Sequence, residues 1–251
     1  MVLVDTHCHL SFPPLCDDLE GVLARAARVG VTEVVVPAYD TGSWPQVEAL
    51  AGRPGLHLAF GLHPWAADEE LGLDQLATLL RGPGVVAVGE VGLDFKLETF
   101  DRERQLRVLD LQLELAVNLD LPVLLHCRGA FPEMTAAVER FAPRLRGVVH
   151  AYSRGPEPAL RFVELGLFIA FGGAVTRPNA RRARHTAQLV PFERIVLETD
   201  APSIGLDGVP PEQAEPRHVR EVAVALAELR GESLENVARV TTENAHALLS
   251  T

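Results

Sequence analysis

Short, nearly continuous apolar runs alternate with longer amphipathic segments along the whole chain, and this alternation restricts the possible folds most. Eight runs rich in leucine and β-branched residues lie at 2–4, 31–36, 56–60, 85–88, 122–125, 147–149, 167–171 and 195–197. Such runs are typical of parallel strands that are buried on both faces. Segments with helical periodicity lie between and after them, at 17–29, 43–51, 73–80, 101–118, 131–141, 156–165, 179–189, 212–229 and 234–249.

Eight strands, each followed by a helix, predict an α/β protein with the (β/α)8 fold of a TIM-like barrel. The length of 251 residues agrees with that fold. No GxGxxG or GxxxxGK[ST] loop follows any run, so a nucleotide-binding doubly wound sheet is not indicated. Since no linker-like change of composition divides the chain, we expect one barrel domain over residues 1–251, with the Pro/Gly-rich stretch 201–216 as a loop.

The charge and the cysteines limit the class of protein. With 34 acidic and 23 basic residues the formal net charge is −11, which argues against coating nucleic acid or an anionic membrane through bulk charge. A nuclease whose metal ions meet the phosphates locally is still allowed. The three cysteines show no CxxC spacing, and no apolar stretch approaches a membrane span or a leader peptide. We expect a cytoplasmic enzyme that needs no membrane and no obligate protein partner.

Polar side chains of the types that bind metals follow six of the eight apolar runs. Barrel enzymes build their active sites at the carboxyl ends of the strands, so these side chains are expected to meet. The second and seventh runs offer no such group. The others are followed in chain order by Asp5, His7 and His9; by His63; by Glu90 and Asp94; by His126 and Arg128; by His150; and by Glu198 and Asp200.

The pattern at the first and fourth runs favours a cation. His7 and His9 are two residues apart in an extended segment, so their imidazoles project to the same side. Two imidazoles directed at one point suit a divalent ion. Glu90 ends a buried run, where an uncompensated carboxylate costs several kcal/mol or becomes neutral. Asp5 has the alternative of a turn or cap carboxylate, and its role is left open.

His126 and His150 end buried runs in the same way, and Asp200 follows the last run. Asp200 has the alternative of capping the following turn, but the five other candidates favour a ligand. Four histidines and two carboxylates exceed the needs of one tetrahedral ion and are enough for two ions that share a carboxylate and a water. This implies hydrolysis, in which one ion polarises the scissile bond and both ions activate the shared water. Structural roles are expected for His57, His185, His218 and His246.

Six motifs resemble those of the TatD family of metal-dependent deoxyribonucleases, which are amidohydrolase-like barrels. They are DTHCHL at 5–10, GLHPW at 61–65, GEVGLDF at 89–95, LPVLLHCR at 121–128, HAYSRG at 150–155 and VLETDAP at 196–202. The resemblance implies a barrel with two divalent metals that hydrolyses phosphodiester bonds of DNA. It also implies that one ion is held by His7, His9 and Asp200 and the other by His126 and His150, with Glu90 between them.

The chain departs from the family pattern at three places. Gly129 stands where the family usually has an acidic residue, residues 214–216 read Ala-Glu-Pro in place of Asn-Glu-Pro, and the C-terminal pattern is reduced to Asn244 with Leu248 and Leu249. None of these positions is a predicted ligand. The three departures leave the substrate preference open, but they do not affect the predicted metal chemistry.

The leading hypothesis is a dinuclear deoxyribonuclease, 3'-5' exonuclease-like, that acts on single-stranded DNA or frayed ends. Glu90, Asp200 and His63 are the predicted catalytic residues. His63 is expected to face the ions, binding phosphate or giving a proton to the leaving oxygen, with a turn histidine before Pro64 as the alternative. Predicted phosphate contacts are Arg128 and Arg154. Predicted base-stacking residues are Tyr152, Phe95 and Trp65, with packing at the barrel rim as the alternative.

Other activities fit the same ligands. A metal-dependent amidohydrolase, a lactonase or an aminoacyl-tRNA deacylase would use the same chemistry on a carbonyl centre. A non-catalytic binding protein would be expected to have lost ligands, and all six are present. Four imidazoles favour Zn²⁺, Mn²⁺ or Co²⁺, whereas the resemblance also allows Mg²⁺. The roles of Asp94 and Glu198 are left open.

Overall fold

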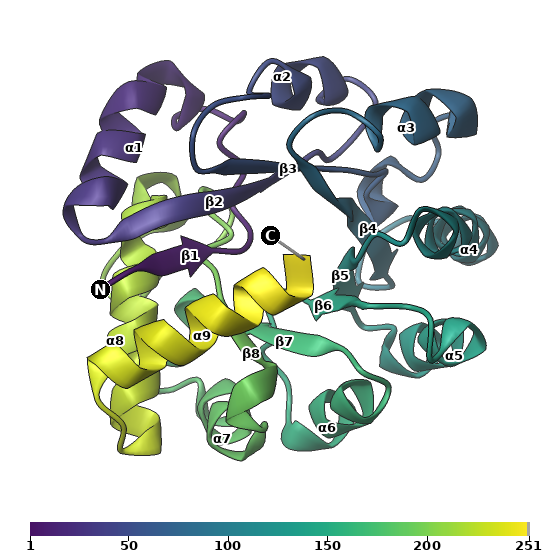
Figure 1. The fold of residues 1–251 in the computed structure, drawn as a ribbon. Helices are drawn as coiled ribbons and strands as arrows, with labels where there is room; N and C mark the ends of the chain where they lie inside the picture. Colours follow the sequence, from purple (N-terminus) through teal and green to yellow (C-terminus); the bar gives the residue numbers. More distant parts are fainter. Residues whose placement is uncertain (250–251) are drawn as a thin grey trace.

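Eight parallel strands form a nearly closed barrel in the computed structural model, which describes residues 1–249 (Figure 1). The strands lie side by side in the order of the sequence, and each pairs in parallel with the next. This confirms the predicted (β/α)8 fold. The strands are β1 (Leu3–Asp5), β2 (Val31–Pro37), β3 (Leu56–Phe60), β4 (Val85–Asp94), β5 (Val123–Arg128), β6 (Gly147–Val149), β7 (Phe168–Phe171) and β8 (Ile195–Leu197).

Helices surround the barrel and bury their apolar faces against the outer side of the strands (Figure 1). The helices are α1 (Leu19–Arg28), α2 (Trp44–Glu48), α3 (Leu73–Leu79), α4 (Arg102–Leu119), α5 (Phe131–Phe141), α6 (Pro156–Glu164), α7 (Arg181–Leu189), α8 (Val219–Arg230) and α9 (Leu234–Leu249). In the part of the chain that the structure describes, no helix is long and apolar enough to cross a membrane.

The barrel is closed between its first and last strands by the segments that follow them. The Thr6 amide donates to the Leu197 carbonyl at 3.0 Å. The Asp200 amide donates to the His7 carbonyl at 2.8 Å. The closing hydrogen bonds therefore fix the backbone at two predicted metal ligands.

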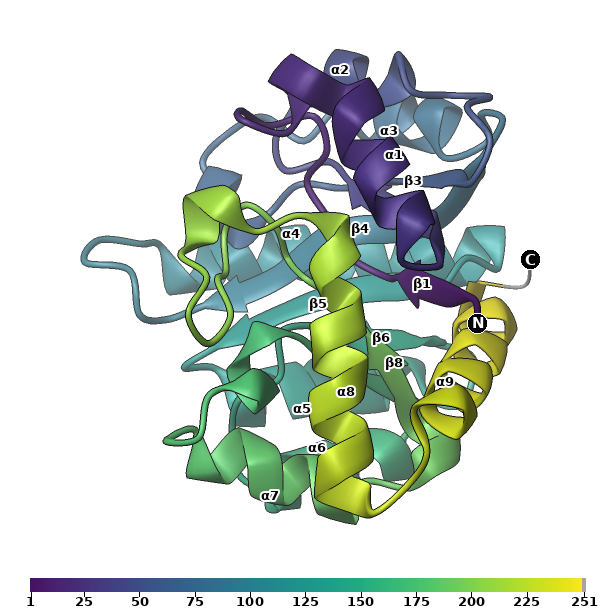
Figure 2. The same ribbon diagram turned by 90° about the vertical axis from the view of Figure 1, so that its left-hand side faces the viewer.

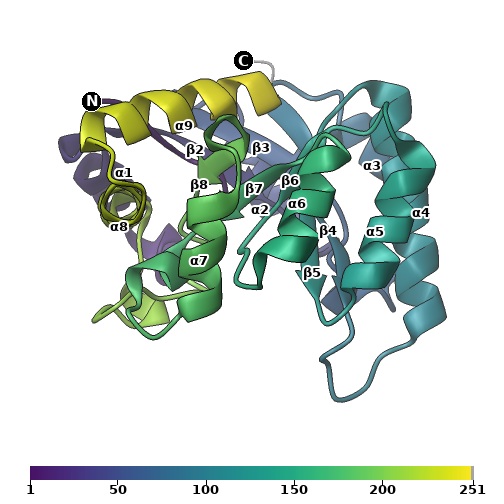
Figure 3. The same ribbon diagram turned by 90° about the horizontal axis from the view of Figure 1, so that it is seen from below.

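Helix α9 covers the amino-terminal end of the barrel. Leu248 and Leu249 pack against the innermost layer of strand side chains, which includes Val35, Ala59 and Leu124. The Asn244 side chain donates to two backbone carbonyls near β8, which fixes the helix in place. Figures 2 and 3 show α9 at one end of the molecule and the loops that follow the strands at the opposite end. In the described residues, α9 therefore covers one end of the barrel and leaves the loop end open to a substrate.

Strand β4 is longer than the sequence predicts. It was expected at 85–88 but continues to Asp94, so Glu90 and Asp94 lie within the strand and not after it. The register shifts between Val88 and Val91, which marks a bulge. Gly92 has φ +157°, and a Cβ there would lie 2.0 Å from the His126 carbonyl oxygen. The strand can continue only because glycine allows this close approach.

The helix expected at 212–229 begins later than predicted. Helix α8 starts at Val219, and two short 3₁₀ helices, Pro211–Gln213 and Pro216–His218, occupy the preceding residues. The prolines lack an amide donor and limit the conformation of the residues before them, so an α-helix cannot run through this stretch.

Candidate metal centre

All six predicted ligands lie together at the carboxyl-terminal end of the barrel. Each is buried except for His126, which is partly exposed. They come from separate elements that the barrel topology brings to one point. His7 and His9 follow β1, Glu90 lies in β4, His126 in β5, His150 follows β6, and Asp200 follows β8.

One group consists of His7, His9 and Asp200. The Nε2 atoms of the two histidines are 3.3 Å apart, and Asp200 Oδ1 lies 3.4 Å from His9 Nε2 and 3.9 Å from His7 Nε2. Ligand atoms about 2.0–2.1 Å from a tetrahedral ion are separated by about 3.3–3.4 Å. The three atoms therefore have the spacing of one face of a coordination shell.

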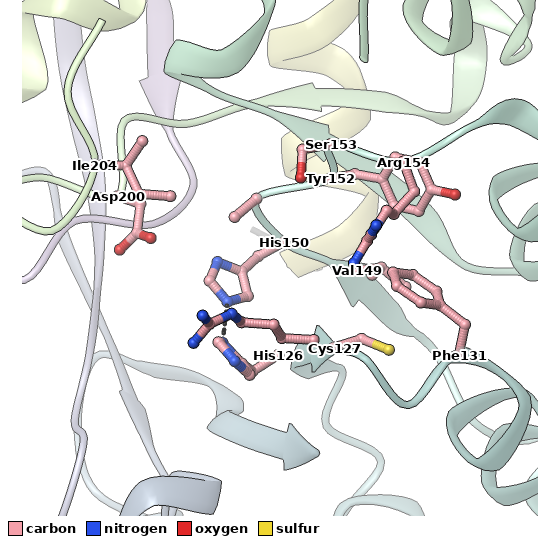
Figure 4. Close-up of a pocket in the computed structure, with 12 residues that line it drawn as sticks. His126, Cys127, Phe131, Val149, His150, Tyr152, Ser153, Arg154, Asp200 and Ile204 are labelled. Atoms are coloured by element: carbon pink, nitrogen blue, oxygen red, sulfur yellow. Dashed lines mark hydrogen bonds between the residues drawn. The ribbon is translucent and has the colours of Figure 1, made fainter. Parts of the chain in front are cut away.

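A second group consists of Glu90, His126 and His150. Glu90 Oε1 lies 2.9 Å from His126 Nδ1 and 2.7 Å from His150 Nε2, and these two nitrogens are 3.2 Å apart. Figure 4 shows the two imidazoles facing each other beside the pocket. This triangle is slightly tighter than the first and also fits one face of a coordination shell.

The carboxylate of Glu90 lies between the two groups. Its Oε2 atom faces His7 at 3.2 Å and His9 at 3.5 Å, whereas its Oε1 atom faces His126 and His150. The two oxygens of one carboxylate are thus directed to different pairs of imidazoles. That is the arrangement expected of a carboxylate shared by two cations.

The charges of the buried cluster also fit a cation. Burial alone would raise the pKa of Glu90, but His150, His63 and His7 hold it well below its usual range. Burial alone would lower the pKa of His9, but hydrogen bonds to Asp200 and Glu90 raise it to about 10. Without metal, protons on the imidazoles therefore balance the carboxylates. A cation can take the place of those protons, as ligand imidazoles must be neutral.

Two further carboxylates, Asp94 at the end of β4 and Glu198 just after β8, lie beside the histidines that are predicted ligands. Asp94 Oδ2 lies 3.5 Å from His126 Nε2 and accepts a hydrogen bond from the Trp65 indole at 2.7 Å. Glu198 Oε1 lies 3.8 Å from His150 Nδ1. Carboxylates in such positions orient ligand imidazoles and fix the nitrogen that faces the metal. Asp94 and Glu198 therefore lie beside His126 and His150, but His126 Nε2 and His150 Nδ1 have no hydrogen-bond partner among the described residues.

Asp5 has a different role, which supports its alternative as a turn carboxylate. Its Oδ1 atom accepts the amides of His7 and Thr199, and its Oδ2 atom accepts the Thr199 hydroxyl at 2.6 Å. Burial raises the pKa of Asp5 to about 7. Asp5 therefore joins the segments after β1 and β8, and its oxygens are occupied by protein donors.

His63 lies beside the cluster but is oriented as a donor. Its Nδ1 atom accepts the Trp65 amide at 3.2 Å, so the neutral ring carries its proton on Nε2, which faces Glu90 Oε1 at 3.2 Å. Burial lowers the pKa of His63 to about 4, which keeps the ring neutral. An Nε2–H group cannot ligate a cation, but it can donate to an oxygen of a substrate.

Replacing His63 by alanine is therefore expected to lower turnover at least about tenfold, because a positioned hydrogen-bond donor is lost, while the metal content stays at that of the parent protein. His57→Ala is the matched control. His57 lies in β3, the strand that precedes His63, but its imidazole pairs with Glu33 at 2.8 Å, away from the centre. Loss of metal from His63→Ala would show that His63 is a ligand, and unchanged kinetics would show that it is structural.

A hollow of about 290 Å³ opens on one side of the centre and is basic (Figure 4). Arg128 and Arg154 line it together with the predicted ligands His126, His150 and Asp200. The Arg154 guanidinium lies over the Phe131 ring, 5.8 Å from its centroid. Both arginines predicted to contact phosphate therefore lie beside the candidate metal centre.

Tyr152 lies in the same wall but not as predicted. Its side chain is only 2% exposed, and its hydroxyl donates to the Gly155 carbonyl at 2.7 Å. Its ring packs edge-on against Phe131 and Phe171. The ring face is not available to a base, so the expectation that Tyr152 stacks on substrate is wrong; it shapes the loop that carries His150.

A second hollow, of about 190 Å³, opens on the other side of the centre and is aromatic. Phe12, Tyr39 and Trp65 line it, together with His9 and other residues of the centre. Trp65 is 51% exposed, so its ring is accessible from solvent. Tyr39 follows β2, where the sequence seemed to offer no functional group, and Phe12 was also missed.

Phe95 does not belong to this aromatic group. Its ring stacks on Phe100 with 5.2 Å between the ring centroids. The Arg102 guanidinium lies 5.4 Å from the centroid of the Phe95 ring. Phe95 lines none of the hollows at the centre. Packing in the loop after β4, the alternative to stacking on a base, is what the structure shows.

The histidines expected to be structural lie away from the centre. His57 and His246 each pair with Glu33 at 2.8 Å, and His218 accepts the Glu215 amide. His185 lies on the outer helix α7.

A (β/α)8 barrel with buried imidazoles and carboxylates at the carboxyl ends of its strands defines a metal-dependent hydrolase. Comparison with known proteins gives the family. Residues 4–250 match the family described as TatD related DNase, and the chain belongs to it.

Relatives share nearly the whole chain. The uncharacterized metal-dependent hydrolase YjjV of Escherichia coli K12 is 38% identical over 252 residues, which cover 98% of this chain and 97% of YjjV. The crystal structure of YjjV superposes with a TM-score of 0.94 and covers 99% of this chain and 98% of that one. The 3'-5' ssDNA/RNA exonuclease TatD of Erwinia billingiae is 34% identical over 259 residues, covering 98% of both chains.

Proposed function

We propose that this protein is a dinuclear phosphodiesterase that shortens single-stranded DNA or frayed DNA ends, 3'-5' exonuclease-like. The observation that carries the proposal is the carboxylate of Glu90, whose two oxygens face different pairs of imidazoles. One divalent ion would be held by His7, His9 and Asp200, and the other by His126 and His150. Glu90 would contact both ions. The imidazoles suit Zn²⁺, Mn²⁺ or Co²⁺, and the carboxylates also admit Mg²⁺.

The two hollows suggest a nucleotide as substrate. One side of the centre offers Arg128 and Arg154 for phosphate, and the other offers the Trp65, Tyr39 and Phe12 rings for a base. Bases stack on aromatic side chains regardless of their sequence, which suits a single strand. Relatives named as 3'-5' ssDNA/RNA exonucleases support this substrate class.

The chain's own residues would position the substrate and manage its protons. Bound ions would supply a Lewis acid for the phosphate and activate a water for hydrolysis. Asp200 and Glu90 hold the negative charge that attracts these ions. The Nε2–H group of His63 points toward the centre and would donate to the leaving oxygen. Asp94 and Glu198 lie beside the rings of His126 and His150 and would help to orient them.

All three cysteines are unpaired, which suits a cytoplasmic location, where thiols stay reduced.

The six predicted metal ligands would also serve an amidohydrolase, a lactonase or an aminoacyl-tRNA deacylase, so the substrate must be tested directly.

A substrate panel tests the proposal. With added Mn²⁺, kcat/KM for a single-stranded oligonucleotide is expected to exceed that for a lactone, an acyl ester and an aminoacyl ester at least about a hundredfold, because the arginines and aromatic rings match a nucleotide. Glu90→Gln, assayed in parallel, controls for a contaminating nuclease. Preference for any carbonyl ester over the oligonucleotide in the parent protein would contradict the assignment.

A further inference from the structure

One stretch of this acidic chain is entirely without acidic residues. Residues 165–192 contain Arg177, Arg181, Arg182 and Arg184 and no aspartate or glutamate, although the whole chain has a net charge of −11. Four arginines without compensating carboxylates in the sequence nearby create a local positive potential, which attracts anions.

The stretch lies beside the loop that carries a predicted metal ligand. Thr186 in α7 donates its hydroxyl to the Arg154 carbonyl at 2.7 Å. Arg154 follows His150 by four residues in that loop. Helix α7 is therefore attached to the basic wall of the metal centre, and its arginines continue that wall outward.

Three hollows meet at Ser153. The basic hollow of about 290 Å³ reaches from His126 and His150 to Ser153 and Arg154 (Figure 4). A neighbouring hollow of about 120 Å³ also includes Ser153 in its lining. An outer hollow of about 340 Å³ is lined by Ser153, Asn179, Ala180, Arg181, Arg182 and Ala183. The surface is thus hollowed from the metal centre to the start of α7.

Two of the arginines are held by the protein and two are not. Arg177 donates to the Gly205 carbonyl at 2.6 Å, and Arg184 to the Val175 carbonyl at 2.7 Å. The side chains of Arg181 and Arg182 are exposed and have neither an acceptor nor a carboxylate partner within residues 1–249. Their guanidinium groups are available to bind an anion from outside.

We infer that Ser153, Arg154, Arg181 and Arg182 form a phosphate track that holds the nucleic-acid strand beyond the scissile bond. The inference rests on the proposed nuclease function and specifies its substrate as a strand of several phosphates. The aromatic hollow lies on the other side of the centre and takes the terminal nucleoside. The remaining strand then runs past Arg154 to α7, where guanidinium groups bind its phosphates without reading its sequence.

The double variant Arg181→Ala/Arg182→Ala tests the track. Its control is Arg28→Ala/Arg144→Ala, which changes the net charge equally. These residues lie at the end of α1 and just after α5, each shortly before a strand begins, and so at the end of the barrel opposite the centre. For each protein, kcat/KM is measured on bis(p-nitrophenyl) phosphate and on oligothymidylates from the dinucleotide to about 16 nucleotides, over a range of salt concentrations.

The track predicts a loss that depends on strand length. For the longest strand, kcat/KM of the Arg181/Arg182 variant should fall about fivefold to tenfold at low salt, and the slope of its logarithm against log[salt] should become shallower by about 1.4, because two phosphate contacts are lost. The dinucleotide, the small diester and the control variant should show parent values.

Other outcomes separate the two claims. If the parent cleaves long strands and the Arg181/Arg182 variant keeps the parent's length dependence, the track is wrong and the nuclease function stands. An equal loss on the small diester would also overturn the track, since the arginines would then act on the centre itself. If the parent hydrolyses carbonyl esters but no oligonucleotide with any of the four metals, the proposed function fails and the track fails with it.

Discussion

Exhaustive chelation is expected to abolish hydrolysis by this protein, and a divalent ion is expected to restore it. The reason lies in the buried cluster, where the carboxylates of Glu90 and Asp200 are held anionic and His63 is held neutral. None of these groups can activate a water on a phosphodiester without a cation to stabilise the charge. Turnover of bis(p-nitrophenyl) phosphate after treatment with EDTA, dialysis and addition of Zn²⁺, Mn²⁺, Co²⁺ or Mg²⁺ measures this.

A second readout controls for loss of the fold. An ion that binds only the folded chain stabilises it, by about 2.7 kcal/mol at a hundredfold excess over Kd, so adding metal should raise Tm in the absence of substrate. Full activity in dialysed protein that contains no detectable metal would refute metal dependence.

Replacing Glu90 by glutamine is expected to lower turnover at least about a hundredfold. Glutamine keeps the shape of the side chain but removes its negative charge. It also places an amide group toward one of the two pairs of imidazoles that the carboxylate oxygens now face. Since both groups of ligands use this carboxylate, the variant should also bind metal more weakly. Kinetics and metal analysis of the same preparation measure both effects.

Glu33→Gln is the matched control for this variant. Glu33 also contacts two histidines, His57 and His246, each at 2.8 Å, but away from the candidate centre. Its replacement should leave turnover and metal content at parent values. Glu90→Gln with parent turnover and an intact fold would show that Glu90 does not bind the ions.

The barrel could be predicted because its strands are buried on both faces. Such strands read as continuous apolar runs, and a helix follows each one, so the order of the sheet follows from the order of the chain. The far end of β4 could not be predicted in this way. Gly89 and Gly92 interrupt the apolar run in the sequence. Only glycine fits at position 92, because the backbone of His126 on the neighbouring strand lies too close for a Cβ atom.

The gathering of the six predicted ligands could also be foreseen, because parallel strands in a barrel end on the same side. The aromatic hollow could not. No sequence pattern distinguishes the aromatic residues Phe12, Tyr39 and Tyr152 from one another. Only tertiary packing places Tyr39 at the centre and buries Tyr152. The positions of Asp94 and Glu198 beside His126 and His150 depend on the orientation of the two rings, which no sequence pattern indicates.

The location and number of the bound ions test the central claim most directly. Anomalous scattering from crystals of the protein loaded with Mn²⁺ is predicted to show two peaks per chain. One should lie among His7, His9 and Asp200 and the other between His126 and His150, with Glu90 contacting both. A single peak, or two peaks of which neither contacts Glu90, would contradict a dinuclear centre built on this carboxylate.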